Sequence, residues 1–270
     1  MAKNNYDQHL HTSFSYDGEK GHTVSRVCET AITKNLAGIA ITDHFDPLWP
    51  DDEFPSTIDL PSYEKALTEA EEIYGDRIAF AKGIELGFIP GEALEMCEDV
   101  VSNYPYDFVL GSVHSSEVVP VDFPVFHEGR TLDEILGEYY ALLLNSIRAY
   151  KNYDVLGHIN YIDRYTNGFA PEKIYMPYVD EILKLAISDG KGIEISTSSY
   201  RYGIEDHGTP TPAILKRFKE LGGEIITIGS DAHTTADIGG YIEKGEEMLL
   251  ALGFRYVAVF KNRRAEFLPL

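Results

Sequence analysis

Histidines and carboxylates recur in short groups along this chain, and most of the groups directly follow a short apolar run. From the N-terminus the groups are His9-Leu10-His11, Asp43-His44, Glu85, His114, His158, Glu194 and Asp231-Ala232-His233. Imidazole nitrogen and carboxylate oxygen together suit Zn, Mn or Fe, whereas Mg prefers mostly oxygen ligands. The residue types therefore predict a site for divalent metal ions.

The spacing within the groups supports a shared site. His9 and His11 stand two residues apart, and so do Asp231 and His233. In an extended segment such residues project from the same face, so both can reach one ion. Glu85 has two carboxylate oxygens and lies between histidine groups, which makes it the natural bridge between two ions. A pair of histidines near an N-terminus often has no function. Here further histidines and carboxylates stand at the ends of the other apolar runs, and this repetition favours a metal site over a chance pair.

The number of candidate ligands exceeds what one ion can use. A catalytic zinc takes about three or four protein ligands, so this set predicts two or three ions. Three dications and three carboxylates leave a charge of roughly +3, which suits a phosphate dianion attacked by a metal-bridging hydroxide. Glu85 and Asp231 would be the carboxylates nearest that hydroxide. The candidates are His9, His11, Asp17, His44, Glu85, His114, His158, Asp231 and His233.

Short apolar runs alternate with amphipathic stretches, which predicts parallel βαβ units and an α/β barrel. In such a barrel the C-terminal ends of the strands converge on one mouth, where the metal-binding groups would meet. The expected strands are Ala37–Ile41, Ile78–Ile84, Asp107–Val113, Tyr153–Gly157, Gly192–Ile195, Glu224–Ile228 and Tyr256–Phe260. The expected helices include Val24–Asn35, Pro61–Tyr74, Leu132–Tyr150, Ile174–Asp189 and Thr211–Leu221.

Length, charge and cysteine content narrow the class of protein. No low-complexity tract or long Ser/Gly linker divides the 270 residues, which favours one domain over 1–270. The 23 Lys+Arg against 44 Asp+Glu give a net charge of -21, which disfavours nucleic acid as a partner. No apolar run approaches the roughly 18 residues of a membrane span. Cys28 and Cys97 fit neither a metal pair nor a disulfide framework, so we expect a cytoplasmic protein. The oligomeric state stays open.

In combination, the motifs resemble the polymerase-and-histidinol-phosphatase (PHP) family, and most of all its histidinol-phosphate phosphatase branch. They span nearly the whole chain in the family's order. The resemblance implies a distorted (β/α)7 TIM-like barrel with a trinuclear metal site at the C-terminal ends of its strands. The motifs are His9-Leu10-His11-Thr12-Ser13, Ile41-Thr42-Asp43-His44, Gly83-Ile84-Glu85, Gly111-Ser112-Val113-His114, Gly157-His158 and Gly229-Ser230-Asp231-Ala232-His233.

The resemblance also implies how the ligands are shared among the ions. The first ion would be held by His9, His11, Glu85 and Asp231, the second by Glu85, His114 and His158, and the third by Asp17, His44 and His233. Many relatives carry a histidine where Asp17 stands here, so His22 competes for that place. Asp43 would orient an imidazole rather than bind an ion.

We also expect positively charged side chains of the protein to bind the phosphate. Arg164 and Arg201 follow two of the strand ends, and the guanidinium fork matches phosphate oxygens in pairs. The histidinol-phosphatase branch resembles the chain here too, with an arginine in each loop. Glu194 and His207 are possible pocket residues, and Glu194 is equally well explained as a structural carboxylate. We expect the segment Ser115–Gly129 to fold over the mouth as a lid.

Three functions stay in competition. The resemblance implies a metal-dependent phosphomonoesterase, a histidinol-phosphatase that converts L-histidinol phosphate to L-histidinol and phosphate in histidine biosynthesis. A phosphatase for another small phosphate ester, or a PHP-type phosphodiesterase or 3′–5′ exonuclease, is the enzymatic alternative. A barrel retained as a scaffold or metal store is the non-enzymatic one, and the intact ligand set argues against it.

Overall fold

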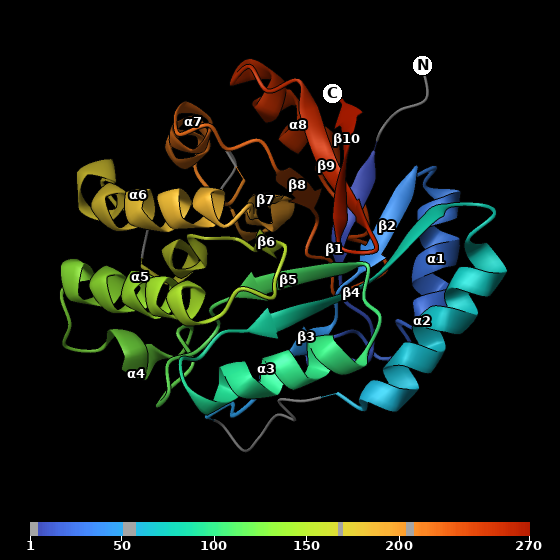
Figure 1. The fold of residues 1–270 in the computed structure, drawn as a ribbon, viewed down its shortest axis with the longest axis horizontal. Helices are drawn as coiled ribbons and strands as arrows, with labels where there is room; N and C mark the ends of the chain where they lie inside the picture. The colour runs from blue at the N-terminus through green and yellow to red at the C-terminus, as the bar shows by residue number, and fades with distance from the viewer. Residues whose placement is uncertain (1–4, 51–57, 167–169, 204–207) are drawn as a thin grey trace.

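The computed structural model describes residues 5–50, 58–166, 170–203 and 208–270, and its centre is a parallel sheet (Figure 1). Within these residues seven strands follow one another in the order β1-β2-β4-β5-β6-β7-β8, and the short β3 (His44–Phe45) pairs with β4. The strands are β1 (Tyr6–Leu10), β2 (Gly38–Ile41), β4 (Ala79–Gly87), β5 (Phe108–Ser112), β6 (Val155–Leu156), β7 (Gly192–Ser196) and β8 (Ile226–Gly229).

The sheet curls until its first and last strands meet at their C-terminal ends. The amide of His11 donates to the carbonyl of Ala232, and the amide of Asp231 donates to the carbonyl of His9, each at 2.9 Å. A bulge in β1 between Asp7 and Leu10 shifts the register there, just where His9 stands. The result is a nearly closed (β/α)7 barrel, which confirms the predicted fold class.

Helices connect the strands and cover the outside of the barrel (Figure 1). They are α1 (Val24–Thr33), α2 (Leu60–Tyr74), α3 (Glu92–Asn103), α4 (Pro124–His127), α5 (Leu132–Ala149), α6 (Glu172–Ser188), α7 (Pro212–Glu220) and α8 (Ile242–Ala251), with 3-10 turns η1 (Tyr161–Tyr165) and η2 (Thr197–Tyr202). The threonines at 23, 131 and 211 cap α1, α5 and α7 by accepting backbone N–H groups. In the described part of the chain, no helix has the length and apolar character to cross a membrane.

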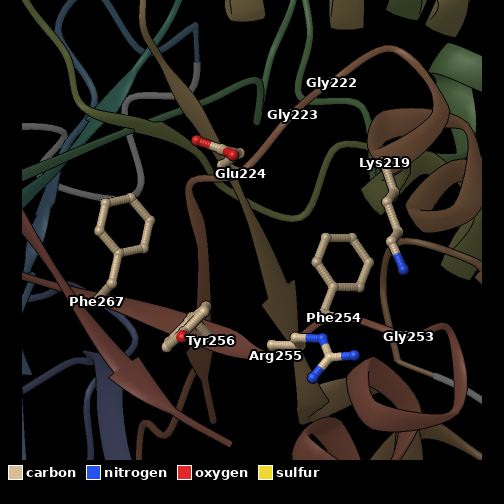
Figure 2. Close-up of a pocket in the computed structure, with 9 residues that line it drawn as sticks. All are labelled: Lys219, Gly222, Gly223, Glu224, Gly253, Phe254, Arg255, Tyr256 and Phe267. Carbon is tan, nitrogen blue, oxygen red and sulfur yellow. The ribbon is translucent and has the colours of Figure 1, made fainter.

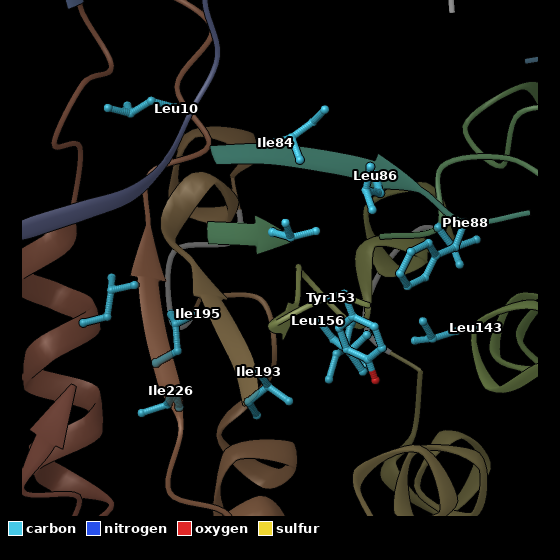
Figure 3. Close-up of a cluster of buried hydrophobic side chains, with 14 of the residues drawn as sticks. Leu10, Ile84, Leu86, Phe88, Leu143, Tyr153, Leu156, Ile193, Ile195 and Ile226 are labelled. Atoms are coloured by element: carbon cyan, nitrogen blue, oxygen red, sulfur yellow. The ribbon is translucent and has the colours of Figure 1, made fainter. Parts of the chain in front are cut away.

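The strands alternate between apolar side chains that face the helices and polar ones that face the interior. On β4, Ile84 and Leu86 join the main apolar core and Glu85 lies between them. On β7, Ile193 and Ile195 do the same on either side of Glu194. Figure 3 shows these four apolar side chains on their strands. Because side chains alternate with a period of two, this packing turns both glutamates toward the inside of the barrel.

The expected strand Tyr256–Phe260 is not a barrel strand, which corrects one element prediction. It is β9 (Tyr256–Lys261), and it pairs antiparallel with β10 (Arg264–Pro269) in a separate two-stranded sheet. The turn between them has positive φ at Asn262 and Arg263 (50° and 61°), as a two-residue hairpin turn requires. One face of the hairpin packs against barrel residues, with the rings of Phe108 and Phe260 stacked at 4.9 Å. The position beside β8 is taken by β1.

The remaining expected strands and helices are present in the structure. Where the observed end of a helix differs from the expected one, it does so by one or two residues. Helices α3, α4 and α8 are not among the helices expected from the sequence. The predicted extent of one domain over 1–270 stays a prediction.

Candidate metal centre

The predicted histidines and carboxylates meet at the C-terminal ends of the barrel strands. His9 and His11 come from the end of β1, Glu85 from β4, and Asp231 from the loop after β8. The side-chain nitrogens Nε2 of His9 and His11 lie 2.9 Å apart. Oε2 of Glu85 lies 3.3 Å from Nε2 of His9, and Oδ1 of Asp231 lies 3.3 Å from Nε2 of His11. Two nitrogens and two oxygens thus face one point in the buried floor of the mouth.

Glu85 is the residue that joins the separate histidine groups. Its Oε1 lies 3.0 Å from Nε2 of His158 and 3.4 Å from Nε2 of His114. Its Oε2 lies 2.9 Å from Nδ1 of His44 and also faces His9. The side chain is fully buried. This central position is the one that a bridging carboxylate needs.

At the outer side of the cluster the structure brings Asp17, rather than His22, to the histidines. Oδ2 of Asp17 lies 3.1 Å from Nε2 of His233 and 3.8 Å from Nε2 of His44. His22 is buried and its Nδ1 pairs instead with the hydroxyl of Thr235 at 3.1 Å. Of the two alternatives that the sequence left open, Asp17 is thus the one in contact with the cluster.

Asp46 is a site residue that the sequence analysis missed. Its Oδ1 accepts from Nδ1 of His114 at 2.8 Å, and its Oδ2 lies 3.4 Å from Nδ1 of His44. Asp46 stands two residues after His44, the same spacing as in His9-Leu10-His11. Applied consistently, that spacing would have found it.

Other carboxylates hold the imidazoles from behind. Nδ1 of His9 donates to Oε1 of Glu194 at 2.7 Å, since a carboxylate only accepts, and this leaves Nε2 free to face the cluster. Oε2 of Glu194 also accepts the backbone N–H of His158 at 3.1 Å. Glu194 is fully buried and lies outside the set of residues that line the cavity above the cluster, so its position is that of a supporting carboxylate.

Asp43 supports the cluster less directly than expected. Its Oδ1 accepts the Ser15 hydroxyl at 2.6 Å, and Oγ of Ser15 lies 3.1 Å from Nδ1 of His11. The carboxylate also accepts the backbone N–H of Thr12 at 2.7 Å. Asp43 therefore orients His11 through the Ser15 hydroxyl rather than by contacting an imidazole.

The buried carboxylates and imidazoles of the cluster stabilise each other's charged forms. Burial alone would raise the pKa of Glu85, but the imidazoles of His9 and His114 hold that pKa well below its usual range. Burial lowers the pKa of His9, yet Glu194 and Glu85 together hold it well above its ordinary value. Burial and the neighbouring charges of His233 and His44 lower the pKa of His11. Metal ions would replace the protons on these imidazoles, so binding is coupled to proton release.

The donor set fits divalent ions. Four combinations of three residues place one ligand atom each within 4.8 Å of the others: His9–His11–Asp231, His9–Glu85–His158, His11–His44–His233 and His44–Asp46–His114. Mixed imidazole and carboxylate donors suit zinc, manganese or iron. The two facing Nε2 atoms of His9 and His11 cannot both be acceptors without a cation between them, whether a proton or a metal ion.

The two predicted phosphate-binding arginines take different positions. Arg164 lines the cavity above the cluster, where its Nη2 donates to the Ser198 hydroxyl and lies 3.2 Å from Oδ2 of Asp231. Arg201 donates from Nη1 and Nη2 to the carbonyls of Ser230 and Asp231, at 2.8 and 2.7 Å. These bonds hold a backbone with positive φ at Asp231 (54°). Phosphate contact by either arginine stays a prediction.

The cavity over the metal cluster has a volume of about 300 Å³. The predicted lid segment reaches it, because Asp122 and Phe123 from that segment are among the lining residues. His207, the other possible pocket residue, lies outside the described residues. The cavity is lined by Tyr16, Asp17, His44, Trp49, His114, Asp122, Phe123, His158, Tyr161, Arg164, Tyr165, Tyr202, Asp231 and His233.

A larger cavity of about 510 Å³ lies away from this chemistry (Figure 2). It is formed by the loops that precede β8 and β9, hence at the N-terminal end of the strands, and by Phe267 of β10. Its lysine, Lys219, donates to the carbonyl of Leu252 at 2.9 Å and lies over the ring of Phe254. No metal-ligating group of the cluster faces it, so the smaller cavity is the candidate active site.

Comparison with known proteins agrees with the geometry. A family model of the PHP domain matches residues 7–198. The chain belongs to the PHP family. A relative from Clostridium acetobutylicum, named a probable histidinol-phosphatase, is 32% identical over 239 residues, covering 87% of this chain and 88% of its own. The family predicted from the motifs is thereby confirmed.

Solved structures of similar proteins share the barrel. Histidinol phosphate phosphatase from Lactococcus lactis, solved with zinc, L-histidinol and phosphate, superposes with a TM-score of 0.88 at 27% identity, covering 97% of this chain and 99% of that one. A putative histidinol phosphatase from Listeria monocytogenes gives a TM-score of 0.76 at 21% identity over 87% of this chain and 98% of its own. The second similarity establishes the fold alone.

Proposed function

We propose that this PHP protein is a histidinol-phosphatase, a phosphomonoesterase that uses two or three divalent ions to hydrolyse L-histidinol phosphate to L-histidinol and inorganic phosphate. One observation carries the proposal: Glu85 lies within 3.6 Å of the imidazole nitrogens of five histidines at the floor of an enclosed cavity. The L. lactis protein, whose structure contains zinc, L-histidinol and phosphate, is similar over nearly the full length of both chains.

The ligand assignment is part of this proposal. Its first set is His9, His11, Glu85 and Asp231, its second is Glu85, His114 and His158, and its third is Asp17, His44 and His233. When bound, divalent ions neutralise charge on the phosphate oxygens and lower the pKa of water toward about 7, so that hydroxide is available near neutral pH. Water supplies the oxygen that bonds to phosphorus, and histidinol leaves as its alcohol.

The residues of the chain hold the reacting groups in place. Arg164 stands beside Asp231 in the cavity wall, from where its guanidinium can donate to phosphate oxygens. Its guanidinium lies over the rings of Tyr161 and Tyr202, at 4.8 and 4.7 Å, which fixes its position. Arg201 supports the same loop through the Ser230 and Asp231 carbonyls and is the second proposed phosphate ligand.

The enclosed cavity favours a small ester over a nucleic-acid strand. A strand-binding enzyme typically has a basic groove with aromatic stacking platforms along it. Here the net charge is -21, and the cavity of about 300 Å³ has Arg164 as its one arginine or lysine among the described lining residues. The cytoplasm is the proposed location, since the free thiols of Cys28 and Cys97 suit a reducing compartment.

The test is phosphate release from L-histidinol phosphate by protein loaded with zinc or manganese. We expect turnover that a chelator abolishes and that added metal restores, and no turnover by the His9→Ala variant. Single-stranded DNA serves as the competing substrate. Absence of phosphate release from metal-loaded wild-type protein would rule the proposal out.

A further inference from the structure

We infer that Asp122 binds the ammonium group of the substrate, and that the enzyme therefore selects phosphate esters that also carry an ammonium group. The inference rests on the proposed function and adds a residue that sets its specificity. Histidinol phosphate has a primary amine that is protonated at neutral pH, so the molecule carries a negative phosphate and a positive ammonium group.

The carboxylates that line the cavity differ in what they contact. Asp17 pairs with His233 at 3.1 Å, and Asp231 pairs with Arg164 at 3.2 Å. Asp122 has no Lys, Arg or His partner within 4.0 Å among the residues that the structure describes. It is thus the cavity carboxylate left available for a cation of the substrate.

The backbone next to Asp122 is fixed by the contacts of its neighbour Val121. The backbone N–H of Val121 donates to the carbonyl of His114 at 2.9 Å. The carbonyl of Val121 accepts from Nε2 of His127 at 2.7 Å, and the Val121 side chain is fully buried. One of the proposed metal ligands therefore sets the position of the segment that carries Asp122.

The cavity has opposite charges at two places. Arg164 and the metal cluster attract phosphate, whereas Asp122 stands at the exposed rim beside Phe123. Partial burial in the cavity wall raises the pKa of Asp122. The aromatic rings in the wall, such as Tyr161 and Tyr165, lower the local polarity and strengthen a charge pair formed there. A molecule with a phosphate and an ammonium separated by a short carbon chain matches this arrangement.

Asp122→Asn tests the inference by removing the charge and keeping the shape. The binding probes are L-histidinol and 3-(imidazol-4-yl)propan-1-ol, which has the same ring and alcohol but no amine, each titrated calorimetrically into zinc-loaded protein. We expect the variant to bind L-histidinol about tenfold more weakly, as for loss of a charged hydrogen bond, and the amine-free alcohol with wild-type affinity. The KM for histidinol phosphate should rise in parallel.

Glu128→Gln is the matched control, because Glu128 is an exposed acid of the same segment and lies outside the cavity lining. It removes the same charge and should change neither affinity. Equal weakening of both probes by Asp122→Asn, or no weakening of histidinol, would overturn the inference. Wild-type turnover of histidinol phosphate tests the proposed function separately, so the two ideas fail through different measurements.

Discussion

Replacing Glu194 by glutamine removes one charge from behind the metal cluster and leaves the side-chain volume nearly unchanged. The two carboxylate oxygens each accept one buried hydrogen, from Nδ1 of His9 at 2.7 Å and from the backbone of His158 at 3.1 Å. A glutamine has one acceptor oxygen, so its amide group must face one of these two donors. If the NH2 group faces His9, Nδ1 must accept its hydrogen, and the proton of the imidazole then lies on Nε2, the nitrogen that faces the cluster.

Both outcomes have a predictable cost. One unpaired buried donor reduces the free energy of unfolding by about 1–3 kcal/mol. Loss of the partner that orients a metal-binding histidine typically reduces metal affinity or activity by about 10- to 100-fold. We therefore expect Glu194→Gln to weaken zinc binding within that range and to reduce kcat/KM for histidinol phosphate.

The assay is competition for zinc against a chromophoric chelator, together with urea unfolding of the metal-free protein. Glu220→Gln is the control, since Glu220 is half-exposed at the end of α7 and pairs with Lys216 and Arg217 on the same helix. A Glu194→Gln protein that is less stable yet binds zinc as tightly as wild type would refute the orienting role. It would leave Glu194 as a structural residue of the barrel interior.

Two further predictions concern stability. A Cβ on Gly229 would lie 2.3 Å from Cβ of His9, so Gly229→Ala should reduce zinc affinity and cost about 1–3 kcal/mol of stability, measured by zinc competition and urea unfolding. Gly137→Ala in α5, where the nearest atom lies at 3.4 Å, should be neutral or stabilising, and equal losses in both variants would contradict the argument. Burial raises the pKa of Asp163 from 3.8 to about 7, so the folded state keeps a proton that the unfolded chain has lost, and stability falls as pH rises through that window. Asp163→Asn lacks this proton, so its free energy of unfolding does not depend on pH in this way. In metal-free protein, kept so by a chelator, the free energy of unfolding of the variant relative to wild type should rise by about 2–3 kcal/mol between pH 5 and 7 and then level off. A difference that stays constant from pH 5 to 7 would contradict this prediction.

The sequence predicted the barrel because each part of the pattern is local. Apolar runs of strand length end in polar residues, and parallel strands in a barrel must bring those ends together. The pairs His9–His11 and Asp231–His233 could be interpreted as same-face ligands from their spacing alone. The structure brings His9 and His11 to Glu85, and it brings Asp231 to His11.

What the sequence could not predict depends on contacts between distant segments. The run Tyr256–Phe260 has the apolar character of a barrel strand, and its hairpin partner β10 is mostly exposed, with little apolar pattern to mark it. The supporting role of Glu194 depends on which nitrogen of His9 it meets. Arg201 follows its strand as Arg164 does, but its guanidinium donates to the carbonyl of Ser230, which is distant in the sequence.

Asp46 is a different case, because its signal was present in the sequence. His44 and Asp46 have the same two-residue spacing as the other ligand pairs. Consistent use of the spacing rule would have placed Asp46 among the candidates.

The most direct test of the proposed metal centre is a titration of metal-free protein with zinc or manganese that follows bound ions per chain and phosphate release from L-histidinol phosphate in the same samples. We expect two or three ions per chain, with turnover that appears as the cluster around Glu85 fills and that is lost in His9→Ala. Saturation with fewer than two ions, or a filled site that releases no phosphate, would contradict this expectation.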